Sequence, residues 1–288
     1  MTVLNKVALV LEGGGMRGMF SAGVFEAFLQ QQLDFPYVVG VSAGACNVVS
    51  YLAHQPLRTR QIITNFVGDP RYCSKRNWLR TGSLFGFDFI LQDIPRHLLP
   101  FDYATFLANP CQLQVGATDC NTGEAVWFSK NAMGTDFTPL RASASLPFLA
   151  PIVSFQGHEL LDGGLAAPIP IAQALASGYK RFVVVLTRNA GYRKTRNYPA
   201  WLLKLKYKQY PHLLRLLEHR AELYNQQLEQ VEQLAAQGAA VIIRPTEPLT
   251  IGRLDLKPAK LLALHDHGTI CALDLLPQLL ALNNTEGE

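Results

Sequence analysis

The sequence has few cysteines, few charged residues and no long apolar segment at its N-terminus. Its five cysteines are odd in number and never form a C-x-x-C pair, which argues against a disulfide framework and against a zinc site. Only 17% of the 288 residues are charged and 49% are hydrophobic, as in a globular rather than a disordered chain. The apolar run Val7–Leu11 is too short for a signal peptide or a membrane span. We therefore expect a reduced, cytoplasmic protein with one large domain, or one domain plus an extension.

Acidic residues are missing from the stretch 163–217, where ten basic residues stand: Lys180, Arg181, Arg188, Arg193, Lys194, Arg196, Lys204, Lys206, Lys208 and Arg215. Such an asymmetry indicates a surface that meets something anionic. Aromatic residues are interleaved with the lysines between Tyr192 and Tyr210, as suits an anionic membrane surface, although a solvated helix face would carry the same charges. We expect peripheral contact with the inner face of a membrane through Arg188–Arg215, and no nucleic-acid partner.

Apolar runs of strand length alternate with helical patterns along the chain, which predicts a parallel or mixed sheet covered on both faces. Strands are expected at Val7–Glu12, 37–39 and 181–187, with one hairpin at 112–118 and 124–128 and a second hairpin at 153–160. Helices are expected at 19–32, 45–53, 57–69, from 139, at 171–178 and 202–237. Residues 72–100 are expected to form an irregular aromatic loop, which beside an active site would make an apolar wall for an acyl chain. The last strand is expected at Ala240–Arg244, before helices within 258–282.

The pentapeptide Gly40-Val41-Ser42-Ala43-Gly44 has the G-x-S-x-G pattern of a nucleophile elbow, in which a serine sits on a sharp turn between a strand and a helix. Side chains two positions before and after the serine would collide where the strand and the helix nearly touch. The serine hydroxyl would lie at a helix N-terminus, where free N–H groups stabilise negative charge. A glycine-rich turn with an incidental serine is the alternative.

A second glycine-rich loop, at 13–18, connects the first strand to the first helix. It lacks the G-K-[ST] of a Walker loop. Gly13, Gly15 and Gly18 satisfy the dinucleotide pattern G-x-G-x-x-G, but the next strand ends without an acidic residue. The same backbone amides suit a phosphate or the oxyanion of an acyl-transfer reaction, and the pattern alone leaves both functions open.

A serine nucleophile needs a base, and the seven histidines are weak candidates because each fits a surface or packing position; His265 and His267 are the only suggestively spaced pair. A carboxylate in a desolvated site can accept the proton itself. Asp162 is the best candidate, since Gly163 and Gly164 let the backbone turn tightly beside it. An Asp-Gly-Gly hairpin turn is the alternative.

Four blocks of the sequence, in this order, resemble the patatin-like phospholipase family: EGGGMRG at 12–18, GVSAG at 40–44, ASASLP at 142–147 and DGG at 162–164. RTGSLFG at 80–86 and IRPTEPL at 243–249 are similar to a bacterial branch of that family. The resemblance implies a three-layer α/β/α fold with a central, mostly parallel sheet and a C-terminal helical extension. It also implies a catalytic region at 1–190, followed by a mostly helical region at 191–288 whose one strand packs on the core.

The resemblance further implies a Ser-Asp dyad, with Ser42 as nucleophile and Asp162 as base, in direct hydrogen-bond contact. The implied oxyanion hole lies in the loop of Gly13, Gly14, Gly15, Met16, Arg17 and Gly18, with Gly40, Ala43 and Gly44 at the elbow and Gly163 and Gly164 in support. Such a dyad needs neither a metal nor a cofactor.

The expected function is hydrolysis of lipid esters, of the phospholipase A or lysophospholipase type, on a lipid or acyl-ester substrate. The same dyad would serve a soluble esterase or thioesterase. A phosphate- or lipid-binding protein without catalysis would use the loop at 13–18 but would need neither Ser42 nor Asp162.

Overall fold

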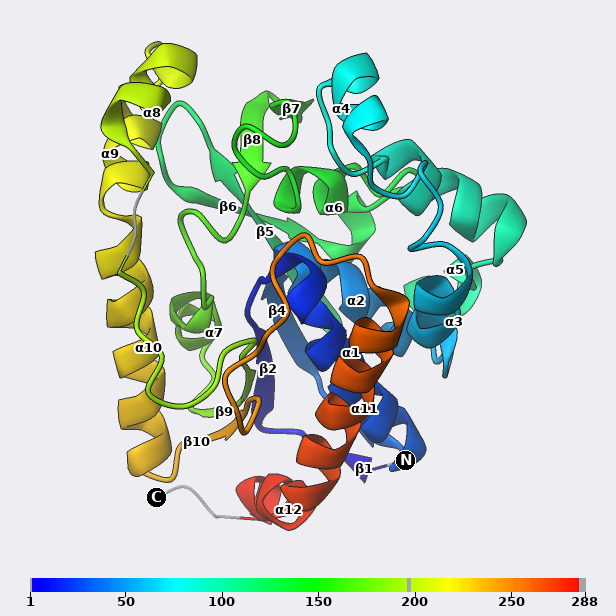
Figure 1. Cartoon of the computed structure of the whole chain (residues 1–288). Helices are drawn as coiled ribbons and strands as arrows, with labels where there is room; N and C mark the ends of the chain where they lie inside the picture. Colours follow the sequence, from blue (N-terminus) through cyan, green and yellow to red (C-terminus); the bar gives the residue numbers. More distant parts are fainter. Residues whose placement is uncertain (1, 196–197, 285–288) are drawn as a thin grey trace.

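The computed structural model describes residues 2–195 and 198–284, and Figure 1 shows its arrangement. Its main sheet has eight strands in the order β10-β9-β2-β4-β5-β8-β7, with β6 beside β5; β1 and β3 form a separate parallel pair. The strands are β1 (Thr2–Val3), β2 (Val7–Leu11), β3 (Leu33–Asp34), β4 (Tyr37–Val41), β5 (Gln112–Asp119), β6 (Ala125–Ser129), β7 (Val153–Phe155), β8 (His158–Asp162), β9 (Arg181–Val185) and β10 (Ala240–Ile243).

The sheet is parallel from β10 to β5 and antiparallel where β6, β8 and β7 join it. The parallel strands are continuous apolar runs that are buried on both faces, as expected of strands covered by helices. The predicted fold class, a central and mostly parallel sheet between helices, is thereby confirmed.

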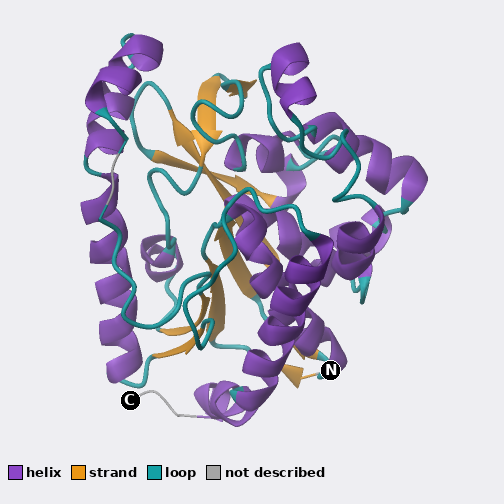
Figure 2. Cartoon of the chain, viewed as in Figure 1, coloured by secondary structure: helices purple, strands orange, loops and turns teal. Residues whose placement is uncertain are grey.

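Helices cover both faces of the sheet (Figure 2). They are α1 (Met19–Gln30), α2 (Ser42–Leu52), α3 (Arg58–Asn65), α4 (Lys75–Thr81), α5 (Tyr103–Ala108), α6 (Thr138–Ser143), α7 (Ile171–Ala176), α8 (Ala200–Tyr207), α9 (Pro211–Glu218), α10 (Arg220–Ala236), α11 (Pro258–Asp274) and α12 (Leu276–Asn284). Short 3-10 segments lie at η1 (Gly15–Gly18) and η3 (Lys130–Ala132), and a π-helix at η2 (Phe89–Leu98).

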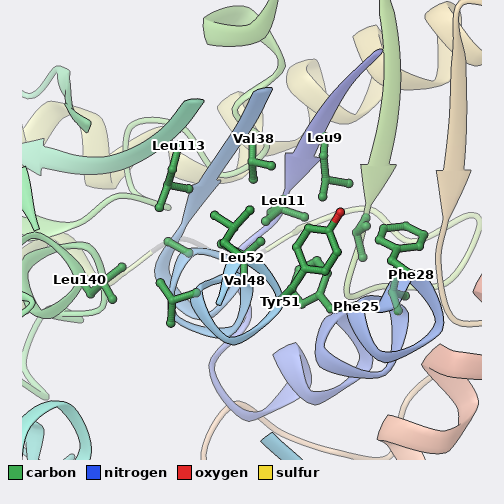
Figure 3. Packing of buried hydrophobic residues seen from close by; sticks show 14 of the residues in the cluster. Leu9, Leu11, Phe25, Phe28, Val38, Val48, Tyr51, Leu52, Leu113 and Leu140 are labelled. Atoms are coloured by element: carbon green, nitrogen blue, oxygen red, sulfur yellow. The ribbon is translucent and has the colours of Figure 1, made fainter. Parts of the chain in front are cut away.

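Alternation along β2 divides the core between the two faces. Leu9 and Leu11 belong to the larger apolar cluster, with α1, α2 and α11, and Figure 3 shows them against Phe25, Tyr51 and Leu52. The residues in between, such as Val10, belong to a second cluster with α7 and α10. This period of two is what a strand requires when both of its faces are buried.

Two predicted segments differ in the structure. Residues 72–100 are not an irregular loop: they contain α4, which Ser74 caps by accepting the Asn77 amide, and the π-helix η2. Both elements were predicted as loop because aromatic residues are interspersed with glycine, such as Gly82, in this segment. The helical region predicted at 202–237 is three helices. Tyr210 has a ψ of 76°, outside the helical range, because the residue before a proline disfavours the α region. His219, with a φ of −106° and a ψ of 18°, separates α9 from α10.

The C-terminal part packs directly on the first helix. The strand expected at Ala240–Arg244 is β10, which ends at Ile243 and pairs in parallel with β9. Helices α1 and α11 cross so closely that a Cβ on Gly268 would lie 2.0 Å from the Phe20 carbonyl oxygen. Arg196 and Asn197 lie outside the described residues. Within the described ranges, we find no helix of the length and apolarity that crossing a membrane requires.

The close crossing of α1 and α11 predicts a large effect for Gly268→Ala. The added methyl group would force the two backbones apart, and we expect a loss of about 2–3 kcal/mol in the free energy of unfolding. Gly68→Ala is the matched control, because nothing lies within 4 Å of a Cβ there. Urea unfolding of both variants measures the difference, and equal stability would contradict the described crossing.

Candidate active site

Ser42 occupies a strained turn between β4 and α2. Its φ is +52°, a left-handed conformation that costs a serine about 1–3 kcal/mol and is typical of functional sites. The helix can start this close to the strand because Gly44 has no side chain: a Cβ there would lie 2.6 Å from the Glu12 carbonyl oxygen. The Ser42 amide donates to Ser143 Oγ at 2.8 Å, which in turn donates to the Gly116 carbonyl at 2.6 Å.

Strand β5 brings Ser42 and Asp162 together. Strands β4 and β8 pair with the same edge of β5, one after the other. Gly116 of β5 pairs with Val41, the last residue of β4. The next residue, Ala117, pairs with Asp162, the last residue of β8. The strands β4 and β8 therefore end beside each other on β5. The side chain that follows Val41 meets the side chain that ends β8, although 120 positions separate them in the sequence.

The two side chains are in direct contact. Ser42 Oγ donates to Asp162 Oδ2 at 2.7 Å, and the two residues are only 6% and 2% exposed. The other carboxylate oxygen, Oδ1, accepts the Gly164 amide at 2.8 Å. Thr118 Oγ1 donates to the Asp162 carbonyl at 2.9 Å, so both the carboxylate and its backbone are fixed in place.

The turn after Asp162 is possible only with glycine at position 163. A Cβ on Gly163 would lie 2.0 Å from the Gly116 carbonyl oxygen. The Gly163 amide donates to the Ser143 carbonyl at 3.1 Å, so the elbow and this turn are tied to the same serine. Ser143 lies in the ASASLP block, where no sequence pattern distinguishes it from its neighbours.

The loop at 13–18 faces the dyad with only part of its backbone. Gly13, Gly14, Gly15 and Arg17 line the same cavity as Ser42 and Asp162. The Met16 amide is already used, because it donates to the Arg253 carbonyl at 3.0 Å. Gly18 lies outside the cavity lining and contacts α2, where its carbonyl accepts Asn47 Nδ2 at 2.9 Å. In the described part of the chain, the amides of Gly14 and Gly15 have no hydrogen-bond acceptor.

Glu12, which begins this loop, is buried and anchors it to two distant segments. Its carboxylate accepts the Thr187 amide and the Thr187 and Tyr224 hydroxyls, the last two at 3.1 Å. Burial raises the pKa of Glu12, while the Thr187 amide and the charge of Arg17 lower it. The backbone of the loop is therefore held rigidly beside Ser42 by a polar network that the sequence pattern did not reveal.

The cavity around Ser42 has a volume of about 280 Å³ and borders an apolar groove of about 950 Å³. Leu146 and Arg253 line both spaces. The groove is lined mainly by apolar residues of 146–149, 198–202 and 252–257. Residues 72–100, expected as an apolar wall, are not part of its lining; Trp78 contributes indirectly, since its indole donates to the Phe148 carbonyl at 3.1 Å. None of the seven histidines lines either space.

A family model described as patatin-like phospholipase matches residues 9–175, more than half of the chain. The chain belongs to the patatin-like phospholipase family. A second model, described as a domain of unknown function (DUF6363), matches residues 210–284. The first match contains Ser42, Asp162 and the loop at 13–18. The second contains Arg220, Tyr224 and Arg253, which complete the wall of the cavity.

Individual relatives are more distant. The uncharacterized protein YjjU of Escherichia coli strain K12 is 29% identical over 198 residues, 64% of this chain and 52% of YjjU. Lysophospholipase NTE1 of Scheffersomyces stipitis is 23% identical over 214 residues, 67% of this chain and 12% of that protein. VipD from Legionella pneumophila has a similar structure, with a TM-score of 0.48 and 13% identity over 94% of this chain and 67% of VipD. The chain thus spans about half the length of YjjU and a smaller part of NTE1.

In this member of the patatin-like phospholipase family, the charge state of Asp162 is set by opposing effects. Burial raises the pKa of its carboxyl group, whereas the hydrogen bond from Ser42, the positive charge of Arg220 and the Gly164 amide lower it. Arg220 is 8% exposed and donates to the Gly164 carbonyl at 3.1 Å. A buried carboxylate with a raised pKa holds a proton more tightly than an exposed one, as a proton acceptor must.

The position of Arg220 predicts the effect of removing its charge. In Arg220→Met the carboxylate of Asp162 loses a stabilising cation, so its pKa should rise further. Selective ¹³C labelling of aspartate carboxyl groups and an NMR titration would measure the shift. Arg220→Lys keeps the charge and should stay closer to the wild-type titration; a lower pKa in Arg220→Met would contradict the described electrostatics.

Proposed function

We propose that this chain is a serine acyl hydrolase that cleaves lipid ester bonds, of the phospholipase A or lysophospholipase type. The observation that carries the proposal is the 2.7 Å hydrogen bond from Ser42 Oγ to Asp162 Oδ2. Hydroxyl and carboxylate are buried at a strained elbow, where a serine nucleophile and its base must be in reach of each other. Membership of a family described as phospholipases supports a lipid substrate.

The proposed reaction begins when Ser42 Oγ attacks the ester carbonyl carbon and its proton passes to Asp162 Oδ2. The negative charge on the carbonyl oxygen is stabilised by the amides of Gly14 and Gly15, which need no reorganisation. The tetrahedral intermediate collapses and the leaving alcohol takes the proton from Asp162, which leaves an acyl group on Ser42. Water then gives a proton to Asp162 and attacks the acyl group, and Ser42 regains its proton as the fatty acid leaves.

The two parts of the chain would contribute differently to this reaction. Residues 1–190 supply the nucleophile, the base and the oxyanion amides. Residues 191–288 supply walls of the cavity and of the groove, through Arg220, Tyr224 and 252–257. The groove is apolar and adjoins the dyad, as a site for an acyl chain must be.

We also propose that the protein works at the inner, cytoplasmic face of an anionic membrane, through Arg188–Arg215. Within this stretch Trp201 and Leu205 on α8 are 71% and 75% exposed, beside the exposed Lys204. Leu202 of the same helix lines the apolar groove, so a lipid surface against α8 would lie next to the mouth of the acyl site. All five cysteines are free, which suits a reducing compartment.

Replacing either dyad residue should abolish hydrolysis. We expect Ser42→Ala and Asp162→Asn to lower kcat by about a thousandfold or more, measured as fatty-acid release from a mixed lipid extract by mass spectrometry. Ser42→Ala should also lose labelling by a fluorophosphonate, which reacts with activated serines. Ser154→Ala, at an exposed serine of β7, is the control and should behave as wild type.

The outcomes separate the competing functions. Labelling of the wild type without fatty-acid release would favour a soluble esterase or thioesterase. If wild type and Ser42→Ala are indistinguishable in both assays, the hydrolase proposal is wrong, and the loop at 13–18 should be tested for nucleotide binding.

Membrane contact through α8 predicts weaker binding to anionic vesicles when its exposed apolar residues are removed. The double variant Trp201→Ala and Leu205→Ala should bind vesicles of phosphatidylglycerol and phosphatidylcholine about tenfold more weakly in a sedimentation assay. Ile270→Ala, which removes an exposed apolar side chain of α11, is the control. Equal binding of both variants would argue against α8 as the contact surface.

A further inference from the structure

The cavity that contains Ser42 is rich in positive charge. Six basic side chains line it, from four separate segments: Arg17, Arg188, Arg193, Lys194, Arg220 and Arg253. The acidic residues of the lining are Glu12 and Asp162. An excess of cations around a reactive serine is not needed for attack on an uncharged ester, so it requires another explanation.

Both carboxylates of the lining are already occupied. Glu12 accepts hydrogen bonds from Thr187 and Tyr224, and Asp162 accepts those of Ser42 and Gly164. Arg193 pairs with Glu232 outside the cavity, at 2.7 Å. The other five cations, which we call the cationic cluster, have no carboxylate oxygen within 4.0 Å among the described residues: Arg17, Arg188, Lys194, Arg220 and Arg253.

Parts of the cationic cluster are withdrawn from solvent with donors unused. Arg17 and Arg220 are each only 8% exposed. The Nε atoms of Arg17 and Arg188 are buried and have no hydrogen-bond acceptor in the described part of the chain. A buried donor on a charged group without an acceptor costs free energy. An acceptor of negative charge in the cavity would remove that cost.

The cations of the cluster also repel one another. Burial, together with the positive charges of Arg220 and Arg253, lowers the pKa of Lys194 to about 7. The pKa of Arg17 is lowered to about 10 by burial and by the charges of Arg188 and Arg253, against the opposing effect of Glu12. Because all five side chains also line one cavity of about 280 Å³, they lie close enough to act on one ligand.

The apolar groove fixes the direction in which such a ligand lies. Because Leu146 and Arg253 line both the groove and the cavity, an acyl chain in the groove places its ester at Ser42 and the alcohol side of the ester in the cavity. A zwitterionic head group would bring its ammonium among five positive charges. A terminal phosphate monoester, with two negative charges and three acceptor oxygens, matches the cluster.

We propose that the cationic cluster binds the phosphate of the substrate and that the substrate is an acyl glycerol with a terminal phosphate monoester. This inference rests on the hydrolase function proposed above. Arginine donors hold the phosphate oxygens, Lys194 adds a point charge, and the phosphate anchors the glycerol so that the ester carbonyl lies between Ser42 and the amides of Gly14 and Gly15.

The test compares three substrates with the same oleoyl chain in mixed micelles: oleoyl glycerol 3-phosphate, oleoyl glycerophosphocholine and uncharged monooleoylglycerol. We expect kcat/KM to be highest for the phosphate monoester, by about tenfold or more. Lys194→Met should reduce its advantage over monooleoylglycerol about tenfold, whereas Lys194→Arg, which keeps the charge, should retain most of it. Lys75→Met removes an exposed lysine of α4, outside the cavity lining and outside Arg188–Arg215, and should leave the ratio unchanged.

Equal kcat/KM values for the three substrates would overturn the proposal. So would an equal loss in Lys75→Met, which would assign the effect to general attraction between the protein and charged micelles. Inorganic phosphate and glycerol 3-phosphate should inhibit monooleoylglycerol hydrolysis competitively. If inorganic phosphate changes the rate without competing, the cluster is a site for free phosphate and the head-group assignment is wrong.

A binding measurement separates this proposal from the hydrolase proposal. Glycerol 3-phosphate should raise the Tm of wild type and of Ser42→Ala, and should raise that of Lys194→Met less, because a ligand that binds only the folded state stabilises it. A Tm shift without hydrolysis of any ester would support the anion site and contradict the hydrolase function. Hydrolysis of monooleoylglycerol without a Tm shift or phosphate preference would support the hydrolase function and contradict the anion site.

Discussion

The contact between Ser42 and Asp162 depends on the register of three strands. Strand β5 pairs with β4 up to Gly116 and with β8 from Ala117 onward, and a slip of one residue on either side would separate the two side chains. A dyad has no imidazole to bridge a gap, so the hydrogen bond of 2.7 Å leaves little tolerance. The backbone approaches closely at Gly116 and Gly163, where no side chain fits, and these close approaches help to fix the same strand register.

The local parts of the site could be predicted from the sequence, because glycine spacing marks places where backbones approach closely. GVSAG identified the elbow at Ser42, and DGG identified the turn at Asp162. Apolar runs of strand length that alternate with helical segments predicted the parallel strands, since strands buried on both faces are continuous apolar runs. The contact between Ser42 and Asp162 across 120 positions, however, was predicted from the family resemblance, because no local pattern encodes the register of β8 on β5.

The rest of the site could not be predicted, because it depends on long-range packing of ordinary residues. Glu12 meets Thr187 and Tyr224 from opposite ends of the chain, and Ser143 supports the elbow from α6. The Arg253 carbonyl accepts the Met16 amide, which removes that amide from the proposed oxyanion hole. The excess of basic residues between 163 and 217 was visible in composition. Composition did not show which of these residues turn inward. Arg188 and Lys194 line the cavity together with Arg17, Arg220 and Arg253, while Lys204 stays outside it.

The cationic cluster and the dyad are electrostatically linked, and the link has a direction. Arg220 stabilises the ionised form of Asp162 and so lowers its affinity for the proton of Ser42. A phosphate held by Arg220 and its neighbours would neutralise part of that positive charge. Asp162 would then become a stronger base at the moment when the substrate is in place, and it would be less basic in the empty site. Under the proposed function, the same charges that select the head group thus also adjust the base that cleaves the ester.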